Sequence, residues 1–512
     1  RGVGEVGFDQ IHPQQFPRRF LVDDRQGDVI QPHIAALAVA ALQLLCVVSM
    51  LPAVLDGQVL EYTLFSFVQD APIAFRVDAL GLVFALTASA LWLVTGVYSI
   101  GYLRALGLEN QTRFHICFAL TMTATMGVAF AANLVTMYLF YEAMTIATYF
   151  LVVHEGHPES YAGGRKYVAY HLGTSIAFLL PAIILTYHSS GTFDFTPGGV
   201  FPPAEVQGHS AWLTMIFVLF LAGSAKVALM PMHGWLPTAM VAPVPVSALL
   251  HAVAVVNAGA FGVLRVMFDV FGPNTMQTLG LDMLAVVVAS VTIVAASAYC
   301  LRLDSLKALL AYSTIGQLAY IVLGGALLNE SGVTGGVLHI VNHGVAKITL
   351  FLCAGAIYVA AHRKYLGEMH GLGRRMPWTM AAFVIGAFSM IGLPATAGFV
   401  SKYFLFVGAW QAGSVLALVV LALSTLLSAG YYLRAIGVLG GMNRGQIPAA
   451  ATPGATGEHV HAPPALVRVH EPSAWMLAPL VLTAGLTLVL GLLPQPTVLA
   501  LVRVVVSALP SP

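Results

Sequence analysis

Long apolar segments with almost no charge dominate the chain, and they constrain its fold more than any other feature. About thirteen of them are long enough to cross the roughly 30 Å apolar core of a bilayer as helices. A bilayer offers no partner for backbone amides and carbonyls, so such segments form helices with internal hydrogen bonds. The sequence therefore predicts an all-α polytopic membrane protein with about thirteen transmembrane helices, at residues 34–56, 81–103, 113–132, 134–153, 167–189, 211–233, 246–268, 279–301, 305–327, 333–361, 378–408, 411–439 and 473–495.

The composition agrees with a membrane setting and argues against several other classes of protein. Hydrophobic residues make up 58% of the 512 residues and charged residues only 9%, whereas soluble domains contain roughly 25% charged residues. The net charge of +1 gives no reason to expect a nucleic-acid partner. The four cysteines form no CxxC pair and no glycine-rich nucleotide motif is present, so we expect no metal, iron–sulfur or nucleotide cofactor in this chain.

The charges between the apolar segments alternate along the chain and predict its orientation. The loops that carry lysine or arginine form one alternate set, and the other set holds acidic residues and, after Arg76, no lysine or arginine. Basic loops remain in the cytoplasm, so the N-terminus is expected there and the C-terminus on the far side. The basic loops hold Arg104 and Arg113; Arg165 and Lys166; Arg302 and Lys307; Arg363, Lys364, Arg374 and Arg375; and Arg434, Arg444 and Arg468; the acidic loops hold Asp194, Glu205, Asp269 and Glu330.

Two stretches fall outside this pattern. Residues 1–33 are polar, begin with Arg1 rather than methionine and contain no recognisable signal peptide. A truncated or misassigned start would give such a segment. Residues 440–472 are rich in proline and histidine and are predicted to form a cytoplasmic loop.

The predicted spans contain several ionisable side chains, and five of them stand on successive parts of the chain: Glu142, Lys226, His251, Lys347 and Lys402. A lysine near the bilayer centre costs about 3 kcal/mol on insertion scales, so it is retained where it faces a partner or a watery cavity. Each residue alone also has a structural explanation. A buried Glu–Lys pair can hold two helices together, and a lone histidine can be hydrogen-bonded within a core. Five such positions in one chain favour an ion pathway.

The predicted span 333–361 carries a stripe of titratable groups. His339, His343 and Lys347 follow one another at four-residue steps, which places them on one face of a helix with roughly 6 Å between neighbours. Histidine changes its charge near neutral pH and suits an intermediate proton carrier. The stripe therefore predicts part of a proton path.

Glu142 and Lys226 have the chemistry of a proton switch. Burial favours the neutral form of an amine, and a nearby carboxylate favours its charged form. A Glu142–Lys226 pair that opens and closes would therefore make Lys226 alternately release and hold a proton. The sequence contains no dedicated set of oxygen ligands for sodium, although carbonyls at a broken helix can supply one.

Two predicted spans are interrupted beside an intramembrane lysine. Pro231 and Pro237 follow Lys226, and a Gly392–Gly398 segment with a proline precedes Lys402. Proline breaks a helix, and the polar backbone this exposes is tolerated only where protein or water lines it. Paired interruptions favour internal repeats around a central pathway. Two ordinary proline kinks are the alternative.

The chain resembles the antiporter-like subunits of respiratory complex I and of Mrp-type cation/proton antiporters over about residues 74–440. EGHPESYAGGRKYVAYHLGTS and the GRRMPWTM loop look closest to the D-type branch of the Mrp family. The segments that carry the wider resemblance are AKVALMPMHGWLPTAMVAPVPVSALLHAVAVVNAG, DSLKALLAYSTIGQLAY, LHIVNHGVAKITLFLCAGAIY and GLGRRMPWTMAAFVIGAFSMIGLPATAGFVSKYF, with FRVDALGLVF and YSIGYLR upstream.

This resemblance implies a fold with two inverted five-helix repeats, each containing a broken helix. It divides the chain into N-terminal transmembrane helices at 34–112, a first repeat at 113–268, a second repeat at 279–439, and a C-terminal transmembrane helix with a tail at 473–512.

The resemblance also implies roles for individual residues. Glu142 and Lys226 would form an inner half-channel, and Lys402 on the second broken helix would be the terminal exit residue. Lys307 follows Asp304 and fits an ordinary cytoplasmic helix end equally well. A central hydrophilic axis would run through His251, Lys307, His339, His343 and Lys347.

The chain departs from the family pattern in three respects. The first of the family's fourteen core helices is replaced by a polar segment. The span 167–189 contains no carboxylate, where one paralogous group has an acid, and His171 is its nearest titratable residue. The long lateral helix of the largest complex I paralogue does not follow the last span.

We therefore expect a proton-translocating integral membrane subunit of a larger complex. In one version an electron-transfer module elsewhere in the complex drives pumping, and in another the complex exchanges protons for sodium or potassium. The expected partners are other antiporter-like and small membrane subunits and the lipid bilayer, in the bacterial cytoplasmic membrane. Without a redox site the chain is not expected to be an enzyme alone.

Two other classes of function use the same residues. One is a non-conducting scaffold subunit that descends from a transporter, which the full set of intramembrane charges disfavours. The other is a subunit that couples protons to inorganic carbon or another solute.

Overall fold

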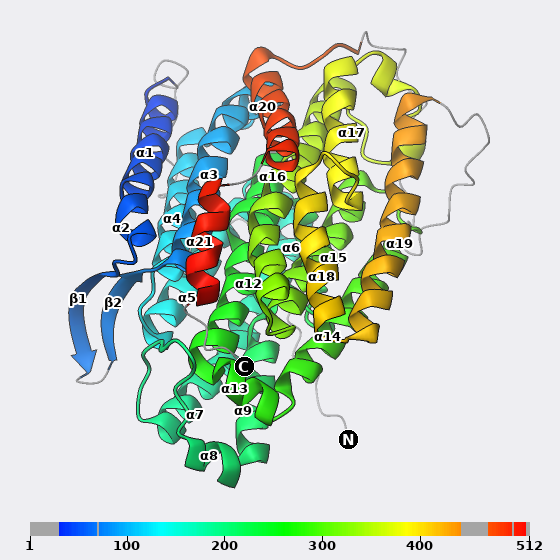
Figure 1. Ribbon diagram of the computed structural model, residues 1–512. Helices are drawn as coiled ribbons and strands as arrows, with labels where there is room; N and C mark the ends of the chain where they lie inside the picture. Colours follow the sequence, from blue (N-terminus) through cyan, green and yellow to red (C-terminus); the bar gives the residue numbers. More distant parts are fainter. Residues whose placement is uncertain (1–29, 69–70, 442–468, 494–495, 508–512) are drawn as a thin grey trace, which may run out of the picture.

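The computed structural model describes residues 30–68, 71–441, 469–493 and 496–507, and these form a helical bundle with one β-hairpin at its side (Figure 1). Most of the predicted polar segment 1–33 and of the predicted loop 440–472 lies outside the described residues. An all-α polytopic fold is confirmed for the bundle, and the hairpin is an addition to it.

Among the described residues, ten helical stretches are long and apolar enough to cross a membrane, and each coincides with a predicted span. The other three predicted spans correspond to α4 (Gln111–Ala129) and to two broken elements, so about thirteen crossings are compatible with the structure. The ten stretches are Pro32–Leu55, Ala79–Ala105, Leu134–Val152, Pro158–Ser190, Val244–Thr278, Leu281–Cys300, Leu306–Ala326, Glu330–Ala361, Val415–Gly440 and Ala474–Leu492.

Two series of five elements follow one another, and the fourth element of each is broken. The first series is α4, α5 (Leu134–Val152), α6 to α7 (Pro158–Thr174, η3 Ser175–Leu179 and Leu180–Ser190), α9 to η5 (Ser210–Gly223, η4 Ala225–Val227, α10 Trp235–Thr238 and Ala239–Val241), and α11 to α13 (Val244–Ala248, η6 Leu249–Val253, α12 Val255–Arg265, η7 Val266–Phe271 and Gly272–Thr278). The second is α14 (Leu281–Cys300), α15 (Leu306–Ala326), α16 (Glu330–Ala361), α17 to α18 (Pro377–Ile391 and Ala397–Gln411), and α19 (Val415–Gly440).

Polar caps begin several of these helices. The side-chain oxygens of Asp78, Asn133 and Asn329 each accept a 2.8 Å hydrogen bond from the backbone amide three residues further on. A helix start leaves amides without intrahelical partners, and Asp and Asn satisfy them well. These residues therefore fix the starts of α3 (Ala79–Ala105), α5 and α16 in an otherwise apolar sequence.

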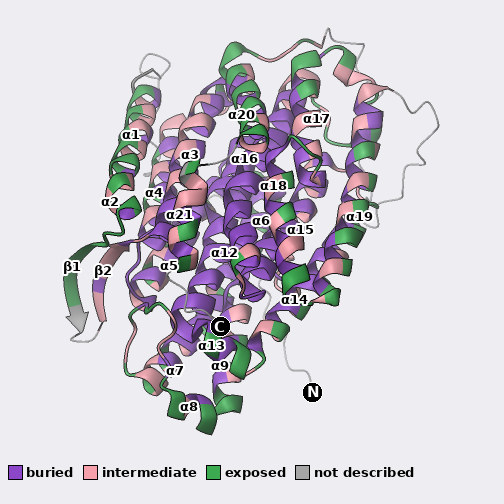
Figure 2. Ribbon diagram, in the orientation of Figure 1, coloured by how far each residue is buried: buried purple, intermediate pink, exposed green. Residues whose placement is uncertain are grey.

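The centre of the bundle is formed by α16 and by the continuous stretch Val244–Thr278 (Figure 2). Helix α16 packs against α3, α15, α17, α18 and the C-terminal helices α20 (Ala474–Leu492) and α21 (Pro496–Ser507). In contrast, α1 (Ile30–Ser49) presents large apolar side chains such as Leu42 and Leu45 to the outside. An outer face of this kind suits lipid or a neighbouring membrane subunit.

Glycines bring α15, α16 and α18 into backbone contact at the N-terminal end of α16. An added Cβ on Gly324 would lie 2.7 Å from the Cα of Gly336, and one on Gly335 would lie 2.7 Å from the amide nitrogen of Leu405. Small residues allow such close packing of membrane helices. We call this contact the glycine junction, formed by Gly324, Gly332, Gly335, Gly336 and Gly408.

The hairpin of β1 (Leu60–Val68) and β2 (Ala71–Val77) was not predicted, because its strands are much shorter than an apolar run of helical length. It is antiparallel, pairs Leu60 with Val77, and has irregular register beyond Thr63. Its β2 strand continues to hydrogen-bond with the α4–α5 connection, where Arg76 N donates to Phe130 O at 2.7 Å. The hairpin thus belongs to the end of the bundle opposite the basic loops, which we call the outer end.

The last predicted span, 473–495, is only the first part of the C-terminal element. Helix α20 ends at Leu492, and α21 continues with apolar residues that pack against α3 and α16. Residues predicted as a tail therefore form a second short helix on the bundle (Figure 1).

Candidate intramembrane site

The first broken element holds Lys226 in an irregular segment at the end of α9. Helix α9 ends at Gly223, and Ala228 has a φ of 56°, a left-handed conformation that costs a non-glycine residue about 1–2 kcal/mol. The indole Nε1 of Trp235 donates to the carbonyl of Ala225 at 2.9 Å and holds the two sides of the break together. The break leaves Lys226 fully buried beside α12.

The amine of Lys226 is held by side chains of α5. Its Nζ donates to Thr145 Oγ1 at 2.6 Å and lies 3.5 Å from the ring centroid of Tyr141. A cation over an aromatic face gains up to about 2 kcal/mol when desolvated. The charged amine is therefore stabilised by a hydroxyl and a π-face from one helix.

Glu142 lies next to this pocket without pairing directly with the lysine. Its carboxylate is close enough to interact electrostatically with Lys226, but no ion pair joins them among the described residues. Both carboxylate oxygens are buried without a hydrogen-bond partner from the described protein. Buried polar atoms of this kind are normally satisfied by ordered water. The predicted pair is thus brought together as neighbours, not as a closed salt bridge.

A histidine that the sequence analysis noted but did not place on the path lies in the same region. His171 of α6 is 1% exposed and sits between two aromatic rings, with centroid distances of 4.4 Å to Tyr167 and 4.2 Å to Trp235. It interacts electrostatically with Lys226. The sequence around His171 gave no indication of its contact with Trp235, because Trp235 belongs to the first broken element, more than 60 residues further along the chain.

His251 occupies the π-helical segment η6 in the centre of the bundle. Its ring lies 4.8 Å from that of Phe351, and both ring nitrogens are without a partner among the described residues. Single π-helical turns inside helices occur frequently at functional sites. Lys347 and Lys307 are both within electrostatic reach of this imidazole.

Lys307 lies at the start of α15, where its Nζ donates to the carbonyl of Ala242 at 2.7 Å. Ser305 is the N-cap of this helix. Lys307 therefore ties the segment before α11 to α15, as a structural helix-end lysine would, and it also reaches His251 electrostatically. The geometry is therefore compatible with a structural lysine at a helix end and also with a member of the central hydrophilic axis.

The three residues of the stripe lie on one buried face of α16, as their spacing predicted. The rings of His339 and His343 are 5.9 Å apart. His339 uses both nitrogens, at 2.8 Å from Ser401 Oγ and 3.0 Å from Gln317 Oε1. His343 has no partner for either nitrogen within the described part of the chain.

Lys347 ends the stripe in a cluster of hydroxyl groups that the sequence analysis missed. Its Nζ donates to Ser313 Oγ at 2.9 Å, to Tyr432 OH at 3.3 Å and to the carbonyl of Leu310 at 3.4 Å. Tyr431 donates to Ser313 at 3.2 Å. Serine and tyrosine are common in apolar helices, so nothing in the sequence marked these hydroxyls as partners of a lysine.

The second broken element holds Lys402 differently. Helix α17 ends at Ile391, and Lys402 reaches back from α18 to donate to the carbonyls of Met390 at 2.7 Å and Ile391 at 3.1 Å. Carbonyls at a helix C-terminus lack intrahelical partners and carry partial negative charge. The ring of Tyr320 lies 5.2 Å from the amine.

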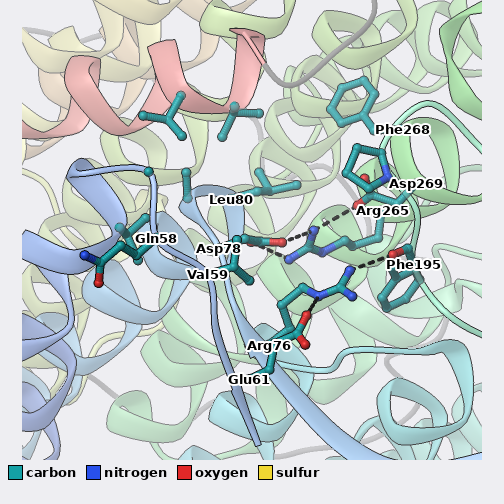
Figure 3. A pocket seen from close by; sticks show the side chains of 16 residues that line it. Gln58, Val59, Glu61, Arg76, Asp78, Leu80, Phe195, Arg265, Phe268 and Asp269 are labelled. Carbon is teal, nitrogen blue, oxygen red and sulfur yellow. Dashed lines mark hydrogen bonds and ion pairs between the residues drawn. The ribbon is translucent and has the colours of Figure 1, made fainter.

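A second group of charges lies apart from this series, in a pocket of about 450 Å³ at the outer end of the bundle (Figure 3). Arg265 lies 2.6 Å from Asp78 and 2.8 Å from Asp269. Arg76 contacts Glu61 at 2.7 Å and donates to the carbonyl of Phe195. The cluster was not predicted, because Arg265 and Asp269 fall at the end of a predicted span. Paired charges join the start of α3 to α12 and η7, and Arg76 attaches the hairpin to the segment that carries Phe195.

Comparison with known proteins identifies the family. Residues 131–428 match the family model described as "NADH:quinone oxidoreductase/Mrp antiporter, TM". The chain belongs to this family. Among its relatives, the NADH-quinone oxidoreductase subunit N of Desulforudis audaxviator is 30% identical over 482 residues, which cover 93% of this chain and 91% of the relative.

Other members of the family are similar over shorter stretches. Subunit M of Rickettsia typhi is 29% identical over 359 residues, or 70% of each chain. A putative antiporter subunit of Staphylococcus haemolyticus is 28% identical over 436 residues, or 81% of this chain and 53% of that protein. These relatives include both kinds of subunit, so the resemblance to the D-type branch of the Mrp family stays a prediction.

Solved structures share the fold of the described chain. A chain of the Mrp complex from Dietzia sp. DQ12-45-1b superposes with a TM-score of 0.80 at 23% identity, covering 94% of this chain and 92% of that chain. A chain of an archaeal membrane-bound sulfane sulfur reductase gives 0.77 at 22% identity, covering 93% and 92%. The antiporter-like fold is therefore confirmed.

Proposed function

We propose that this chain is a proton-translocating, antiporter-like subunit of a multi-subunit membrane complex. The observation that carries the proposal is the series of buried titratable groups between the two helix breaks, held among hydroxyls, aromatic rings and backbone carbonyls. Intramembrane ionisable groups that face a bundle interior mark ion pathways by default. Relatives in sequence are named as a subunit of an NADH-quinone oxidoreductase and a putative antiporter subunit.

In this proposal each group of residues has a distinct task. Glu142 sets the charge state of Lys226 at the first break, and Lys402 at the second break passes the proton onward. His251 and Lys307 connect the first break to the α16 stripe. Water completes the contacts of the imidazoles that lack protein partners, since a buried polar atom without any partner is unfavourable. The transfer order is Glu142, Lys226, His251 with Lys307, then Lys347, His343 and His339, and finally Lys402.

The two series of five elements act as two half-channels in the proposal, with boundaries near residues 113–268 and 279–439. The N-terminal helices 34–112 and the C-terminal element 473–512 then enclose them. We place the chain in the bacterial cytoplasmic membrane with its basic loops inside. A single cysteine near Arg374 should resist an impermeant thiol reagent in intact cells and one near Glu330 should react, whereas equal labelling at both positions would contradict this orientation.

The chain would work with other antiporter-like and small membrane subunits. In an antiporter the exchanged cation is sodium or potassium, and in a redox pump an electron-transfer module supplies the energy. A potential of 100 mV provides about 2.3 kcal/mol per charge, enough to change the state of a buried Glu–Lys pair. Purification of the complex and identification of its subunits separates the two versions. Hydrogenase-like or quinone-reductase subunits indicate a pump, and small Mrp-type subunits an antiporter.

The test of proton translocation uses Lys347, which lies at the centre of the series. Lys347→Met keeps length and apolar bulk but removes the titrating amine, so we expect normal insertion and assembly with little proton uptake by membrane vesicles. Lys347→Arg keeps the charge but does not readily deprotonate, so it should also be impaired. Proton uptake by the methionine variant at the wild-type rate would reduce the stripe to a packing element.

A further inference from the structure

We propose that His171 is a further proton-binding residue of the first half-channel, which passes protons from the cytoplasmic side of the bundle to Lys226. This inference rests on the proposed function and adds an entry residue to it. The span 167–189 contains no carboxylate, and the imidazole of His171 in α6 occupies a place from which a proton could be delivered to the first break.

The surroundings of His171 are unusual for a histidine with a purely structural role. The side chain is buried, and neither Nδ1 nor Nε2 has a hydrogen-bond partner among the described residues. A buried polar atom left without a partner costs about 1–3 kcal/mol. His115 of α4 is an example of a buried histidine with a structural role, because its Nε2 has a hydrogen-bond partner, Nδ1 of His33, at 2.8 Å. His171 instead keeps both nitrogens available for a proton and for water.

Lys226 is the charged group that the imidazole can serve. Trp235 packs against the ring of His171 and donates its own Nε1 hydrogen to the carbonyl of Ala225, the residue before Lys226. Several elements pack against α6. Three of them carry no charged side chain: η3, η5 and α10. The other two are η4, which carries Lys226, and α5, which carries Glu142 and tyrosines. Lys226 is therefore the charged group that acts on His171, and Glu142 lies on the neighbouring α5.

The other side of His171 leads towards the cytoplasmic loops. Tyr170 precedes it, and the tyrosine ring lies 6.0 Å from the amine of Lys166, one turn earlier in α6. The turn that contains His233 and Gly234 packs against the hydroxyl of Tyr170. His233 itself is half-buried and so can meet water at the surface. A second protonatable group, His233, thus lies two residues before Trp235 in the chain.

The transfer step is a relay through one ring. A neutral His171 binds a proton from the cytoplasmic side at one nitrogen and becomes an imidazolium. It then releases the proton of its other nitrogen, through water, to the neutral amine of Lys226, which becomes an ammonium while the ring returns to neutral. His171 and Lys226 interact electrostatically, and two positive charges there would repel each other. His171 therefore binds its proton when the amine of Lys226 is neutral.

The test combines a space-filling variant with chemical rescue of a truncated one. In membrane vesicles that carry the whole complex, His171→Phe should reduce proton uptake about tenfold or more, with unchanged amount and thermal unfolding of the complex. His171→Gln should be similarly impaired, and it covers the case in which phenylalanine does not fit. His115→Phe is the matched control, a buried histidine outside the pathway, and should transport like the wild type.

His171→Ala leaves a space the size of an imidazole ring. Added imidazole should raise its proton uptake several-fold, whereas pyrazole, which has the same ring shape but is not protonated near neutral pH, should not. Imidazole should have no effect on His171→Phe, where the space is filled. Wild-type uptake by both His171→Phe and His171→Gln, or equal rescue by pyrazole, would overturn the inference and leave His171 as packing.

The result can be separated from a failure of the proposed function. If Lys347→Met transports normally, the proposed pathway itself is wrong. If Lys347→Met is inactive while His171→Phe transports like the wild type, the pathway stands and only the role of His171 is lost.

Discussion

Each of the two broken helices has a buried lysine beside its break, but the charges of the two lysines are held in different ways. Lys226 is bound by the Thr145 hydroxyl and the Tyr141 ring, with the Glu142 carboxylate close by. Lys402 is bound by two backbone carbonyls at the end of α17. Side chains can rotate away or change their own charge, whereas a helix end offers a fixed partial charge.

This difference assigns different properties to the two ends of the proposed pathway. The proton affinity of Lys226 responds to the charge of a neighbouring carboxylate. That of Lys402 responds to the geometry between α17 and α18, because no side chain supplies its hydrogen-bond acceptors among the described residues. In the proposed pathway, the proton affinity of the lysine at the first break can thus be switched by protonation of a side chain. The proton affinity of the lysine at the second break is set by backbone geometry.

The largest effect should come from removing the carboxylate at the first break. Glu142→Gln leaves Lys226 without a nearby negative charge, and we expect proton uptake by vesicles to fall about tenfold or more, with near-normal amounts of the complex. Glu142→Asp keeps the charge and should retain most of the activity. Uptake at the wild-type rate in Glu142→Gln would show that this carboxylate does not switch the lysine, and failure to accumulate would favour a structural pair.

A smaller effect is expected from shifting the lysine at the second break. An added Cβ on Gly392 would lie 2.7 Å from Cδ of Lys402, so Gly392→Ala should move the amine away from its two carbonyls. Uptake should fall about fivefold, a free-energy change of about 1 kcal/mol, because the contacts of the charged amine are weakened and not lost.

Gly413→Ala is the matched control for that variant. Gly413 has a φ of 61°, and Gly392 one of 92°, but nothing lies within 4 Å of a Cβ added at Gly413. Both variants carry the strain of a left-handed alanine, about 1–2 kcal/mol, so thermal unfolding should change in both. Equal uptake by the two would mean that the carbonyl contacts of Lys402 do not matter for transport.

The smallest effect should follow loss of a single hydroxyl at the first break. Thr145→Val removes the acceptor 2.6 Å from the Lys226 amine but leaves the Tyr141 ring and Glu142, so uptake should fall only about twofold to threefold, a free-energy change of under 1 kcal/mol. Thr145→Ser should restore it. A loss as large as that of Glu142→Gln would mean that the hydroxyl, and not the carboxylate, controls the first lysine.

The sequence predicted those parts of the site that depend on spacing along one helix. The stripe of His339, His343 and Lys347 required only the helical repeat, and the breaks beside Lys226 and Lys402 required only proline and glycine in an apolar run. Both were expected where the structure has them. The apolar runs likewise predicted the helical bundle, because crossing a bilayer leaves few choices of backbone structure.

Contacts between distant helices could not be predicted in this way. The hydroxyls of Ser313 and Tyr432 around Lys347 come from α15 and α19, and serine and tyrosine have no periodic pattern there. The same holds for Trp235 beside His171. The hairpin was missed for another reason, since its strands are shorter than a membrane span and β1 is largely exposed.

The glycine junction has a mechanical consequence for the central helices. Since α15, α16 and α18 are in backbone contact at the outer end, they cannot separate there without losing that close packing. If the space between these helices widens and admits water to the stripe, the separation must therefore begin at the opposite end of the helices. The junction would act as the hinge of that movement, and the inner ends would travel furthest.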